Sequence, residues 1–572
     1  MRLLTTTSIS RRRLIQSALV ASGATVLTPL IVACGGSDAT PTQGSTSSGA
    51  GSTSASTSTS ATGGTSASPA ASGSPSSSSA ATSTAPAQAS GPATGTAVIA
   101  QKFPLTDIDS TIQNGVQPLC IAIHVTEPLL FRADTGELQP LLAERFEYVD
   151  PTHLRMTIRQ GVKHHNGDDF SVDDVVFTIQ RVLDPETKSL QARYMQSVTG
   201  AEAVDDTTVE IQLSTSDATI LDRLSLLPMI SKRAAQELGA EFSSKLVGTG
   251  PYKFVSWQKG GRVTLEVFPG YWREPARIKT LQFAGIGEDS TRMAGLKTGE
   301  LNVIDYIPPD YVPQLKDSSN VTVSQVTGLR SSFAIFNVSK KPFDDVRMRQ
   351  AANYAVNKQD IVDGVFNGYA VAVDQPFGPN VFGYDPSLEN HYPYDPDKAK
   401  SLMAEAGYAD GVDVNMVINI DDQSVAEPVV DQLGKVGIRV KQKVLDFNGL
   451  ANQYLTLKEP SPELDIVLFD NANNTAEANY NLALNFSSLA KKGRGLYWSD
   501  PEVDEWIVQG REETDRNKRL EIYHRIVQKM AETAAMIPLI DPDVIYGSTK
   551  NLTDWKPRSD QLIYLYGASI TS

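Results

Sequence analysis

Cysteine, histidine and positive charge are scarce in this chain of 572 residues. If Cys34 is modified, Cys120 has no partner, so no intramolecular disulfide holds the core together. Cys120 itself lies in the apolar run PLCIAIHV, which predicts a small buried core residue. A formal net charge of -15 argues against nucleic acid or an anionic membrane surface as a partner, because like charges repel.

Sequence motifs for catalysis, nucleotide binding and metal binding are also missing. The chain has no GxxxxGK[ST] or GxGxxG phosphate loop, no HExxH, no CxxC and no GxSxG. The chain has only six histidines that could ligate a metal. His164 and His165 are adjacent, and the side chains of adjacent residues on a strand or turn rarely point in the same direction. We therefore expect no catalytic residue, no metal and no cofactor.

The N-terminus carries two signals for export. Ser10 to Gln16, SRRRLIQ, resembles a twin-arginine signal and precedes a moderately apolar stretch interrupted by Ser, Thr, Gly and Pro. Ile31-Val32-Ala33-Cys34 resembles the lipobox of bacterial lipoproteins, in which the cysteine thiol receives a diacylglycerol. We expect residues 1–33 to be a signal peptide and Cys34 to be the lipid attachment site, since several acyl chains anchor a protein stably. The alternative is a transmembrane anchor of about 20 residues.

Residues 34–95 are expected to be a disordered tether. From Gly35 to Gln101 the only charged residue is Asp38, and Ser, Thr, Ala and Gly dominate. Such a segment lacks the apolar residues needed to offset its ordering entropy. A coil of about sixty residues has an r.m.s. span of about 40–45 Å. The folded part is therefore expected to begin near Thr96.

Strands and helices alternate along the rest of the chain, which predicts the α/β class. Ser171 is expected to cap a helix with Asp173 and Asp174 in its first turn. A helix is also expected between residues 123 and 130. Further strands are expected at residues 97–103, 154–159, 207–213, 252–257 and 262–268, and further helices at 289–299, 346–357, 396–407 and 516–534.

Four blocks of sequence, in order, resemble the peptide/nickel-type extracytoplasmic solute-binding proteins of ABC importers. The first two are TEPLLFRADTGELQPLLAERFEY, continuing to Pro185, and VGTGPYKFVSW with the following FPGYW. The third and most specific is FAIFNVSKKPFDDVRMRQAANYAVNKQDIVDGVFNG, residues 333–368. The fourth is YWSDPEVDEWIVQGREETDRNKRLEIYHRIVQKMAETAAMIPLI. Most of these residues are typical of a scaffold rather than of a site.

This resemblance implies a two-lobe, periplasmic-binding-protein-like fold with a hinge. Lobe I is expected to comprise residues 96–327 and 531–572, with an inserted subdomain at about 135–245. Lobe II is expected to comprise residues 328–530. Two chain crossings, near residues 325–332 and 530–541, are expected to form the hinge, and the lobes close on a ligand between them.

The family further implies that an acid after the strand ELDIVLF pairs with the ligand's α-amino group. Glu477 falls near that position, and Asp470 is the alternative, but Ala478 replaces the usual proline. Asn471 and its asparagine-rich neighbours also suit sugar hydroxyls or another polar solute, which leaves the ligand class open. The segment can equally be a solvated loop.

Five other residues are candidate ligand contacts. Arg330, at the expected crossing, suits a ligand carboxylate, and its alternative role is an interlobe salt bridge. Asn114 and Gln117 follow the first strand, where family members contact ligand. Tyr497 and Trp498 are candidate aromatic walls.

The expected function is that of a lipid-anchored, extracytoplasmic receptor rather than an enzyme. It captures a small solute, with an oligopeptide as the first candidate, and delivers it to ABC permease subunits as a monomer. The alternatives are an exported lipoprotein hydrolase, or a surface sensor or adhesin on a stalk.

Overall fold

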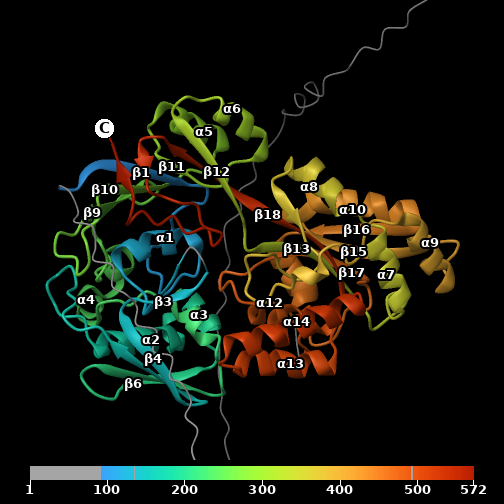
Figure 1. The fold of residues 1–572 in the computed structure, drawn as a ribbon, viewed down its shortest axis with the longest axis horizontal. Helices are drawn as coiled ribbons and strands as arrows, with labels where there is room; N and C mark the ends of the chain where they lie inside the picture. Colours follow the sequence, from blue (N-terminus) through green and yellow to red (C-terminus); the bar gives the residue numbers. More distant parts are fainter. Residues whose placement is uncertain (1–91, 134–135, 491–493, 572) are drawn as a thin grey trace, which may run out of the picture. The chain divides into compact units, whose positions relative to one another are not determined.

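The computed structural model describes residues 92–133, 136–490 and 494–571 (Figure 1). All of them belong to one compact unit that the chain forms from residue 86 onward. The expected signal peptide, Cys34 and nearly all of the expected tether lie outside the described residues.

A mixed sheet of 12 strands is the backbone of the fold. Its main path runs β16-β15-β17-β13-β18-β11-β1-β10-β9-β8, and β12 and β14 pair with β18 beside this path. The strands are β1 (Thr94–Gln101), β8 (Tyr252–Trp257), β9 (Arg262–Val267), β10 (Ile278–Gly285), β11 (Val303–Ile304), β12 (Val321–Thr327), β13 (Arg330–Phe336), β14 (Ala370–Ala372), β15 (Val412–Asn419), β16 (Ile438–Leu445), β17 (Ile466–Ala472) and β18 (Met536–Thr549).

Strand β18 belongs to both lobes. Its first half, from Met536 to Ile540, pairs with β13, and its second half, from Asp543 to Thr549, pairs with β12. Between β12 and β13 the chain crosses at Gly328, whose N–H donates to the Pro542 carbonyl at 3.0 Å. A Cβ at residue 328 would lie 2.9 Å from that carbonyl oxygen, so glycine permits the close approach. The two crossings therefore lie side by side.

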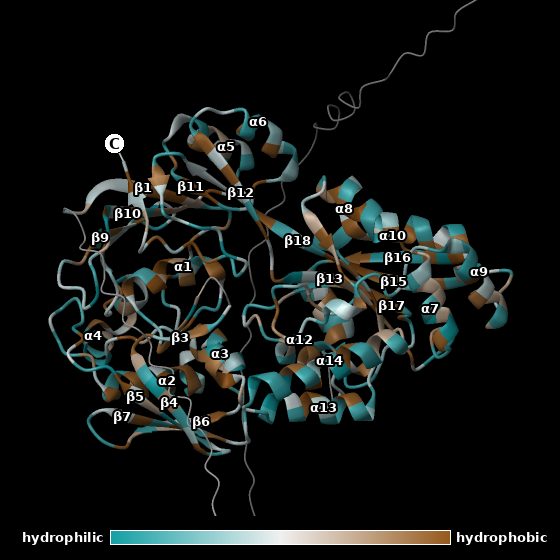
Figure 2. Ribbon diagram, in the orientation of Figure 1, coloured by the Kyte–Doolittle hydropathy of each residue, from teal (hydrophilic) through white to brown (hydrophobic). Residues whose placement is uncertain are grey.

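The buried side chains divide at the same place. Three hydrophobic clusters contain only residues from 97–321 and 544–568, and two others contain only residues from 329–540. We call the first group lobe I and the second lobe II. Figure 2 shows hydrophobic residues along β15 and β17 and hydrophilic ones on the outer helices α10, α13 and α14, as core packing requires. The expected α/β fold with two lobes is confirmed.

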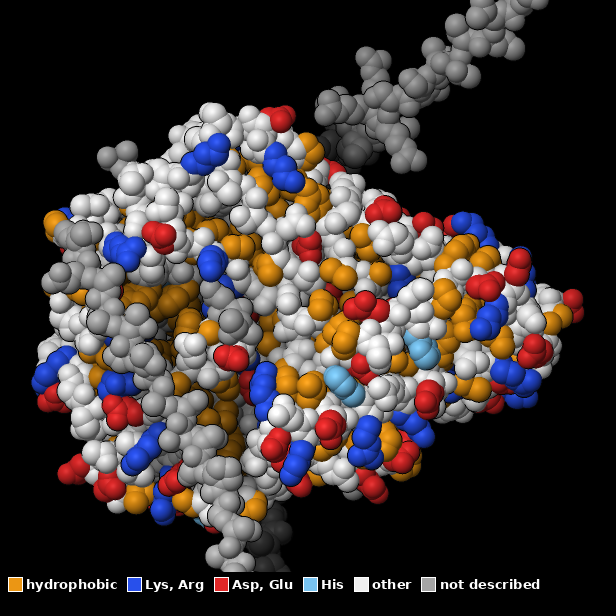
Figure 3. All heavy atoms as spheres, viewed as in Figure 1, with side chains coloured by type: hydrophobic (Ala, Val, Ile, Leu, Met, Phe, Trp, Pro, Cys, Tyr) orange, Lys and Arg blue, Asp and Glu red, His pale blue; other side chains and the backbone are white. Residues whose placement is uncertain are grey.

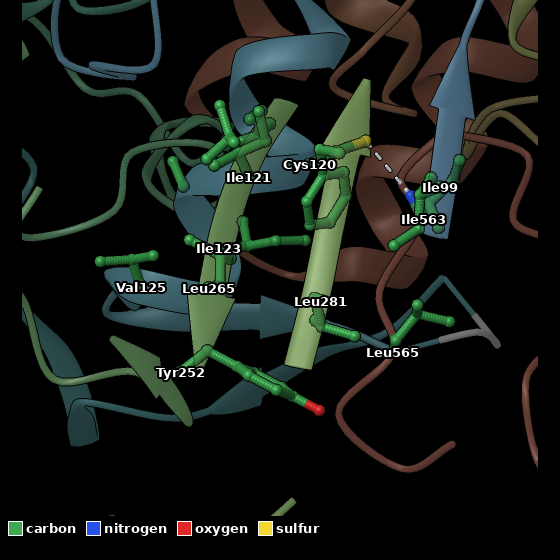
Figure 4. Close-up of a cluster of buried hydrophobic side chains, with 14 of the residues drawn as sticks. Ile99, Cys120, Ile121, Ile123, Val125, Tyr252, Leu265, Leu281, Ile563 and Leu565 are labelled. Carbon is green, nitrogen blue, oxygen red and sulfur yellow. Dashed lines mark hydrogen bonds between the residues drawn. The ribbon is translucent and has the colours of Figure 1, made fainter. Parts of the chain in front are cut away.

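Cys120 lies in the core of lobe I, as predicted, where the side chains of α1, β9 and β10 meet (Figure 4). The C-terminal segment also packs there. The Ile563 N–H donates to the Cys120 Sγ at 3.2 Å, and the Leu565 N–H donates to the His124 Nε2 at 3.0 Å. The end of the chain is thus held inside lobe I.

A separate four-stranded sheet forms the inserted subdomain of lobe I, in the order β4-β5-β7-β6. Ser171 and Asp174 form a capping box at the start of α2 (Val172–Leu183), as the sequence predicts. The smaller strands are β2 (Leu130–Arg132), β3 (Leu138–Pro140), β4 (Ala143–Asp150), β5 (His153–Ile158), β6 (Val198–Ala203), β7 (Thr208–Leu213), β19 (Leu552–Thr553) and β20 (Ser569–Ile570).

The helices expected from the sequence are present, with one error. The helix expected between residues 123 and 130 ends at Val125, because Thr126 is extended and Pro128 follows in an isolated β-bridge. The remaining helices are α1 (Val116–Val125), α3 (Ile220–Leu224), α4 (Lys232–Leu238), α5 (Asp289–Thr298), α6 (Val312–Lys316), α7 (Val346–Tyr354), α8 (Lys358–Phe366), α9 (Pro396–Glu405), α10 (Gln423–Val436), α11 (Phe447–Leu450), α12 (Ala478–Asn485), α13 (Pro501–Glu512) and α14 (Arg516–Glu532). In the described part of the chain, no helix has the length and apolar character that spanning a membrane requires.

Candidate ligand-binding site

Arg330 and Asp470 form an ion pair on the surface of lobe II near the crossing. Arg330 opens β13 opposite Ala472, and Asp470 lies two residues earlier on the paired strand β17. The Arg330 side chain is 45% exposed and that of Asp470 is 16% exposed. Burial would lower the pKa of Arg330, but the charge of Asp470 outweighs it and raises the pKa. The pair therefore presents a cation and a carboxylate to solvent side by side.

A second carboxylate, Asp422, lies behind this pair. It accepts hydrogen bonds from the Asp470 N–H at 3.0 Å, the Ser332 hydroxyl at 3.2 Å and the Asn419 amide at 3.2 Å. Burial, and then the charge of Asp470, raises the pKa of Asp422 to about 7. Two acids and one guanidinium thus share the end of the β13–β17 pair.

Arg494 holds the asparagine-rich segment in place through hydrogen bonds. Its Nη1 donates to the Asn471 Oδ1 and the Asn485 Oδ1, both at 2.9 Å, and its guanidinium covers the Phe469 ring at 4.4 Å. Burial lowers the pKa of Arg494 to about 10. Asn471, which was expected to meet ligand, is buried and also donates to Asn481 at 2.6 Å. No motif in the sequence marks Arg494.

The Glu477 side chain is buried and forms its hydrogen bonds within the protein. It caps α12, and its carboxylate accepts from the Asn479 N–H at 2.8 Å and from the Tyr523 hydroxyl, with Arg519 at 3.7 Å. Its side chain is buried, which raises its pKa to about 7, with the charge of Asp222 adding to the effect. These contacts occupy the Glu477 carboxylate within the protein, and its contact with the ligand's amino group stays a prediction.

Tyr497 and Trp498 also lie in the hydrophobic core of lobe II, where they fill space rather than line a cavity. The Tyr497 hydroxyl donates to the Tyr454 carbonyl at 3.0 Å, and Trp498 contacts Phe486 edge to face. The structure thus gives both residues packing contacts, and their role as aromatic walls stays a prediction.

Asn114 lies at the seam between the lobes. It lines a small pocket with a cavity volume of about 20 Å³, together with Gln191, Tyr194 and Asp560 of lobe I and Asn474 of lobe II. Its amide also donates to the Leu190 carbonyl at 3.3 Å. Gln117, in the first turn of α1, is half-buried and does not line this pocket. The structure thus brings Asn114 opposite the asparagine-rich segment.

Three contacts hold the lobes together across the seam. The Arg132 Nη2 donates to the Thr475 carbonyl at 2.7 Å and pairs with Asp222 at 2.9 Å. The Ala218 N–H donates to the Arg511 carbonyl at 2.7 Å. The rings of Tyr194 and Tyr480 lie 5.7 Å apart. Sequence reasoning missed all three, since each joins residues far apart in the chain.

A larger cavity, with a volume of about 540 Å³, lies farther along the seam. Arg516 and Arg519 of lobe II face Glu137, Tyr148 and Asp222 of lobe I in its lining. The seam therefore offers polar groups of both signs over an extended path.

The described residues contain no cluster of three potential metal ligands. The two adjacent histidines point to different partners, since the His164 Nε2 lies 3.2 Å from Asp174 and the His165 Nε2 lies 2.9 Å from the Gly250 carbonyl.

Two lobes joined by two crossings, with charged and amide groups at the seam, define a two-lobe binding protein. The model of the family "Bacterial extracellular solute-binding proteins, family 5 Middle" matches residues 137–493, which is more than half of the chain. The chain therefore belongs to the family 5 extracellular solute-binding proteins, which serve ABC importers. It is a binding protein and not an enzyme.

Two relatives and one solved structure illustrate the likeness. The glutathione-binding protein GsiB of Pectobacterium atrosepticum is 28% identical over 488 residues, covering 83% of this chain and 94% of the relative. The dipeptide-binding protein of Escherichia coli is 29% identical over 438 residues, covering 71% and 81%. The structure of HbpA2 from Haemophilus parasuis matches with a TM-score of 0.77 and 24% identity, over 84% of this chain and all of that one.

Proposed function

We propose that this protein captures a short peptide between its lobes and delivers it to an ABC permease. The observation that carries the proposal is the Arg330–Asp470 pair, which offers one cation and one carboxylate side by side at the seam. A peptide carries the complementary groups, an α-carboxylate and an α-amino group. The names of two relatives, which bind glutathione and dipeptides, support the same ligand class.

In this proposal the ligand replaces the internal partners of the pair. Asp470 receives the α-amino group, Arg330 receives the α-carboxylate, and the amides of Asn114 and Asn474 bind the peptide groups between them. Charge-assisted hydrogen bonds of this kind are the strong ones, and a closed seam keeps water from weakening them. Asn471 acts indirectly, by holding the segment in place with Arg494.

The proposed lobes differ slightly from those expected from the sequence. Residues 531–540 pack into the cores of lobe II, so we place the second crossing at 541–543, at the C-terminal end of the expected range of 530–541. Lobe I then comprises residues 96–327 and 543–572, and lobe II comprises residues 328–541. The lobes turn about Gly328 and Pro542, which are hydrogen-bonded to each other.

We further propose that export uses the twin-arginine signal and that Cys34 carries the lipid anchor. Support comes from the SRRRLIQ run and the IVAC lipobox. The low-charge segment after Cys34 then serves as the tether of an extracytoplasmic, monomeric receptor. Mass spectrometry of the purified protein tests this: a diacylglyceryl group on Cys34 is expected, and an unmodified chain that retains residues 1–33 would contradict it.

Calorimetry on the full chain in detergent tests the ligand class. We expect Ala-Ala, triglycine or reduced glutathione to bind with one site, and glucose not to bind. N-acetylation of the peptide should weaken its binding, because the α-amino group that Asp470 receives is lost. C-terminal amidation should weaken its binding, because the α-carboxylate that Arg330 receives is lost. If glucose binds while every peptide fails, the peptide proposal is wrong and the asparagine-rich segment serves another polar solute.

A further inference from the structure

Lobe I contains a second pocket that the proposed peptide site does not use. We call it the aromatic pocket; its lining residues are Phe131, Gln139, Pro140, Leu141, Arg159, Trp272, Arg273, Tyr564 and Tyr566. Its cavity volume of about 300 Å³ lies at the lower end of the range of about 300–1,000 Å³ that is usual for small-ligand sites. The face of the molecule drawn in Figure 3 is hollowed, with hydrophobic side chains in the hollow and lysine or arginine side chains near it.

The β2–β3 hairpin separates this pocket from the seam. Phe131 and Gln139 are paired across the hairpin and both line the aromatic pocket. Their neighbours point to the other face, because side chains alternate along a strand. Arg132 reaches the Thr475 carbonyl of lobe II, and Leu138 lines the large seam cavity. The aromatic pocket is thus built from lobe I alone.

Four aromatic rings form its walls. Phe131 and Tyr564 lie 5.4 Å apart, and Tyr564 and Tyr566 are stacked at 6.1 Å with an interplanar angle of 29°. All four rings, Trp272 included, remain partly exposed. Partly exposed ring faces grouped around one cavity are a surface on which a flat ring can stack.

The pocket has a positive rim. The exposed Arg273 guanidinium lies 5.0 Å from the Tyr566 ring and 5.7 Å from the Trp272 ring, and it makes no ion pair with any described residue. Arg159 covers the other side of Trp272 at 4.9 Å, and its Nη1 is already bonded to Glu144 at 3.1 Å. Arg273 is therefore the cation at this rim that is available to an anion.

Glu127, a buried acid nearby, forms no ion pair with Arg273. The Glu127 carboxylate accepts hydrogen bonds from the Tyr271 hydroxyl at 2.6 Å, the Trp272 Nε1 at 2.8 Å and the Thr249 hydroxyl at 2.9 Å. Burial raises the pKa of Glu127, while these three hydrogen bonds and the charge of Arg273 oppose that rise. Its hydrogen bonds instead fix the Trp272 ring as a wall of the pocket.

We propose that the aromatic pocket is a second ligand site, for a small molecule that carries a flat aromatic ring and a carboxylate. The ring packs on the partly exposed aromatic faces that line the pocket, and the carboxylate meets Arg273 at the rim. Arginine suits this role because its fork matches a carboxylate while its plane stays stacked on an aromatic face. Binding here requires neither lobe closure nor the Arg330–Asp470 pair.

The test uses 2-naphthoate as the probe and the full chain in detergent. Calorimetry with 2-naphthoate is expected to show one site, whereas 2-naphthamide and cyclohexanecarboxylate, which lack the charge or the flat ring, should each bind at least five times more weakly. Arg273→Ala should weaken 2-naphthoate about tenfold, and Tyr566→Leu several-fold. Arg277→Ala is the matched control, since Arg277 is an exposed lobe I arginine outside the pocket, and it should leave binding unchanged.

Each contrary result overturns the proposal in its own way. No binding of 2-naphthoate at millimolar concentration, or equal weakening by Arg273→Ala and Arg277→Ala, rules out a specific site. Loss of 2-naphthoate binding in Arg330→Ala, or its displacement by saturating Ala-Ala, would place the anion at the seam. Because Arg273 is exposed and has no ion pair to lose, melting curves of Arg273→Ala should match those of the unaltered chain. If peptides fail to bind but 2-naphthoate binds as expected, the proposal for the aromatic pocket still holds.

Discussion

Arg330 and Arg132 both lie at the seam between the lobes, yet they are bound in opposite ways. Arg330 is partly exposed and its partner Asp470 belongs to the same lobe, whereas Arg132 is buried and reaches from lobe I to the Thr475 carbonyl of lobe II. The interlobe contact that was an alternative role for Arg330 is therefore made by Arg132. The comparison separates two kinds of contact, since one arginine pairs within its own lobe at the surface and the other links the two lobes from a buried position.

The largest effect is expected from Arg132→Ala. It removes the contact with Thr475 and leaves the buried Asp222 without its cation. Breaking a buried pair in this way costs about 3–5 kcal/mol. Urea unfolding of the ligand-free chain should show this loss, and small-angle scattering should show a more open average shape. If stability and scattering both stay unchanged, Arg132 does not hold the lobes together.

Asp541 is an acid at the seam that pairs with neither Arg132 nor Arg330. It lies on β18 against the Gly378 backbone, is fully buried and takes part in no ion pair among the described residues. Burial raises its pKa from 3.8 to about 7. An acid with a raised pKa in the folded state lowers the free energy of unfolding as pH rises from about 4 to about 7.

We expect Asp541→Asn to remove this loss, which makes the variant more stable than the unaltered chain by about 2–4 kcal/mol at pH 8. At pH 4 the two should be nearly equal, because the acid is then protonated in the folded state. Urea unfolding at the two pH values provides the measurement. Equal stability at pH 8 would show that Asp541 is not held in its neutral form.

Arg330→Ala tests the other side of the comparison. Loss of one charge-assisted interaction, about 1.5–3 kcal/mol, should weaken peptide binding about 10- to 100-fold in calorimetry. The free energy of unfolding should change little, because a partly exposed ion pair contributes about 0–1 kcal/mol. Arg347→Ala is the control, since Arg347 is an exposed lobe II arginine paired with Asp345 away from the seam. Equal effects of the two substitutions on affinity would contradict the proposed role of Arg330.

The smallest effect is expected far from the seam, at Cys120. Cys120→Ala removes the acceptor of the Ile563 N–H and should lower the free energy of unfolding by about 1–2 kcal/mol. Cys120→Ser retains an acceptor, so comparing the two isolates the hydrogen bond from the packing. Peptide affinity should be the same in both, and a change in affinity would mean that the core of lobe I influences the seam.

The sequence predicted local elements better than it predicted the site. Ser171 and Asp174 mark the start of α2 because a capping box is made by residues three apart. Glu477, by contrast, was taken for a ligand contact from its place after β17, and nothing local reveals that Tyr523 and Arg519 occupy its carboxylate. The sequence alone does not distinguish an acid that caps a helix from an acid that binds a ligand.

The place of the second crossing is also hard to derive from local sequence. The run IPLIDPDVIYGST contains Pro542, yet β18 continues through it without a break and is 14 residues long. Pro542 is tolerated there because Asp541 and Asp543 are where β18 changes partners, from β14 and β13 to β12. Only the pairing of distant strands shows that one strand serves both lobes.

The location of the chain ends has a mechanical consequence. The described part begins at β1 in lobe I, and it ends at the C-terminal segment that packs against Cys120 and His124 in the same lobe. A force applied through the N-terminus therefore enters at β1, which pairs along its length with β10. That load passes into lobe I without crossing Gly328 or Pro542. A pull applied through β1 would thus strain lobe I while lobe II stays free to swing.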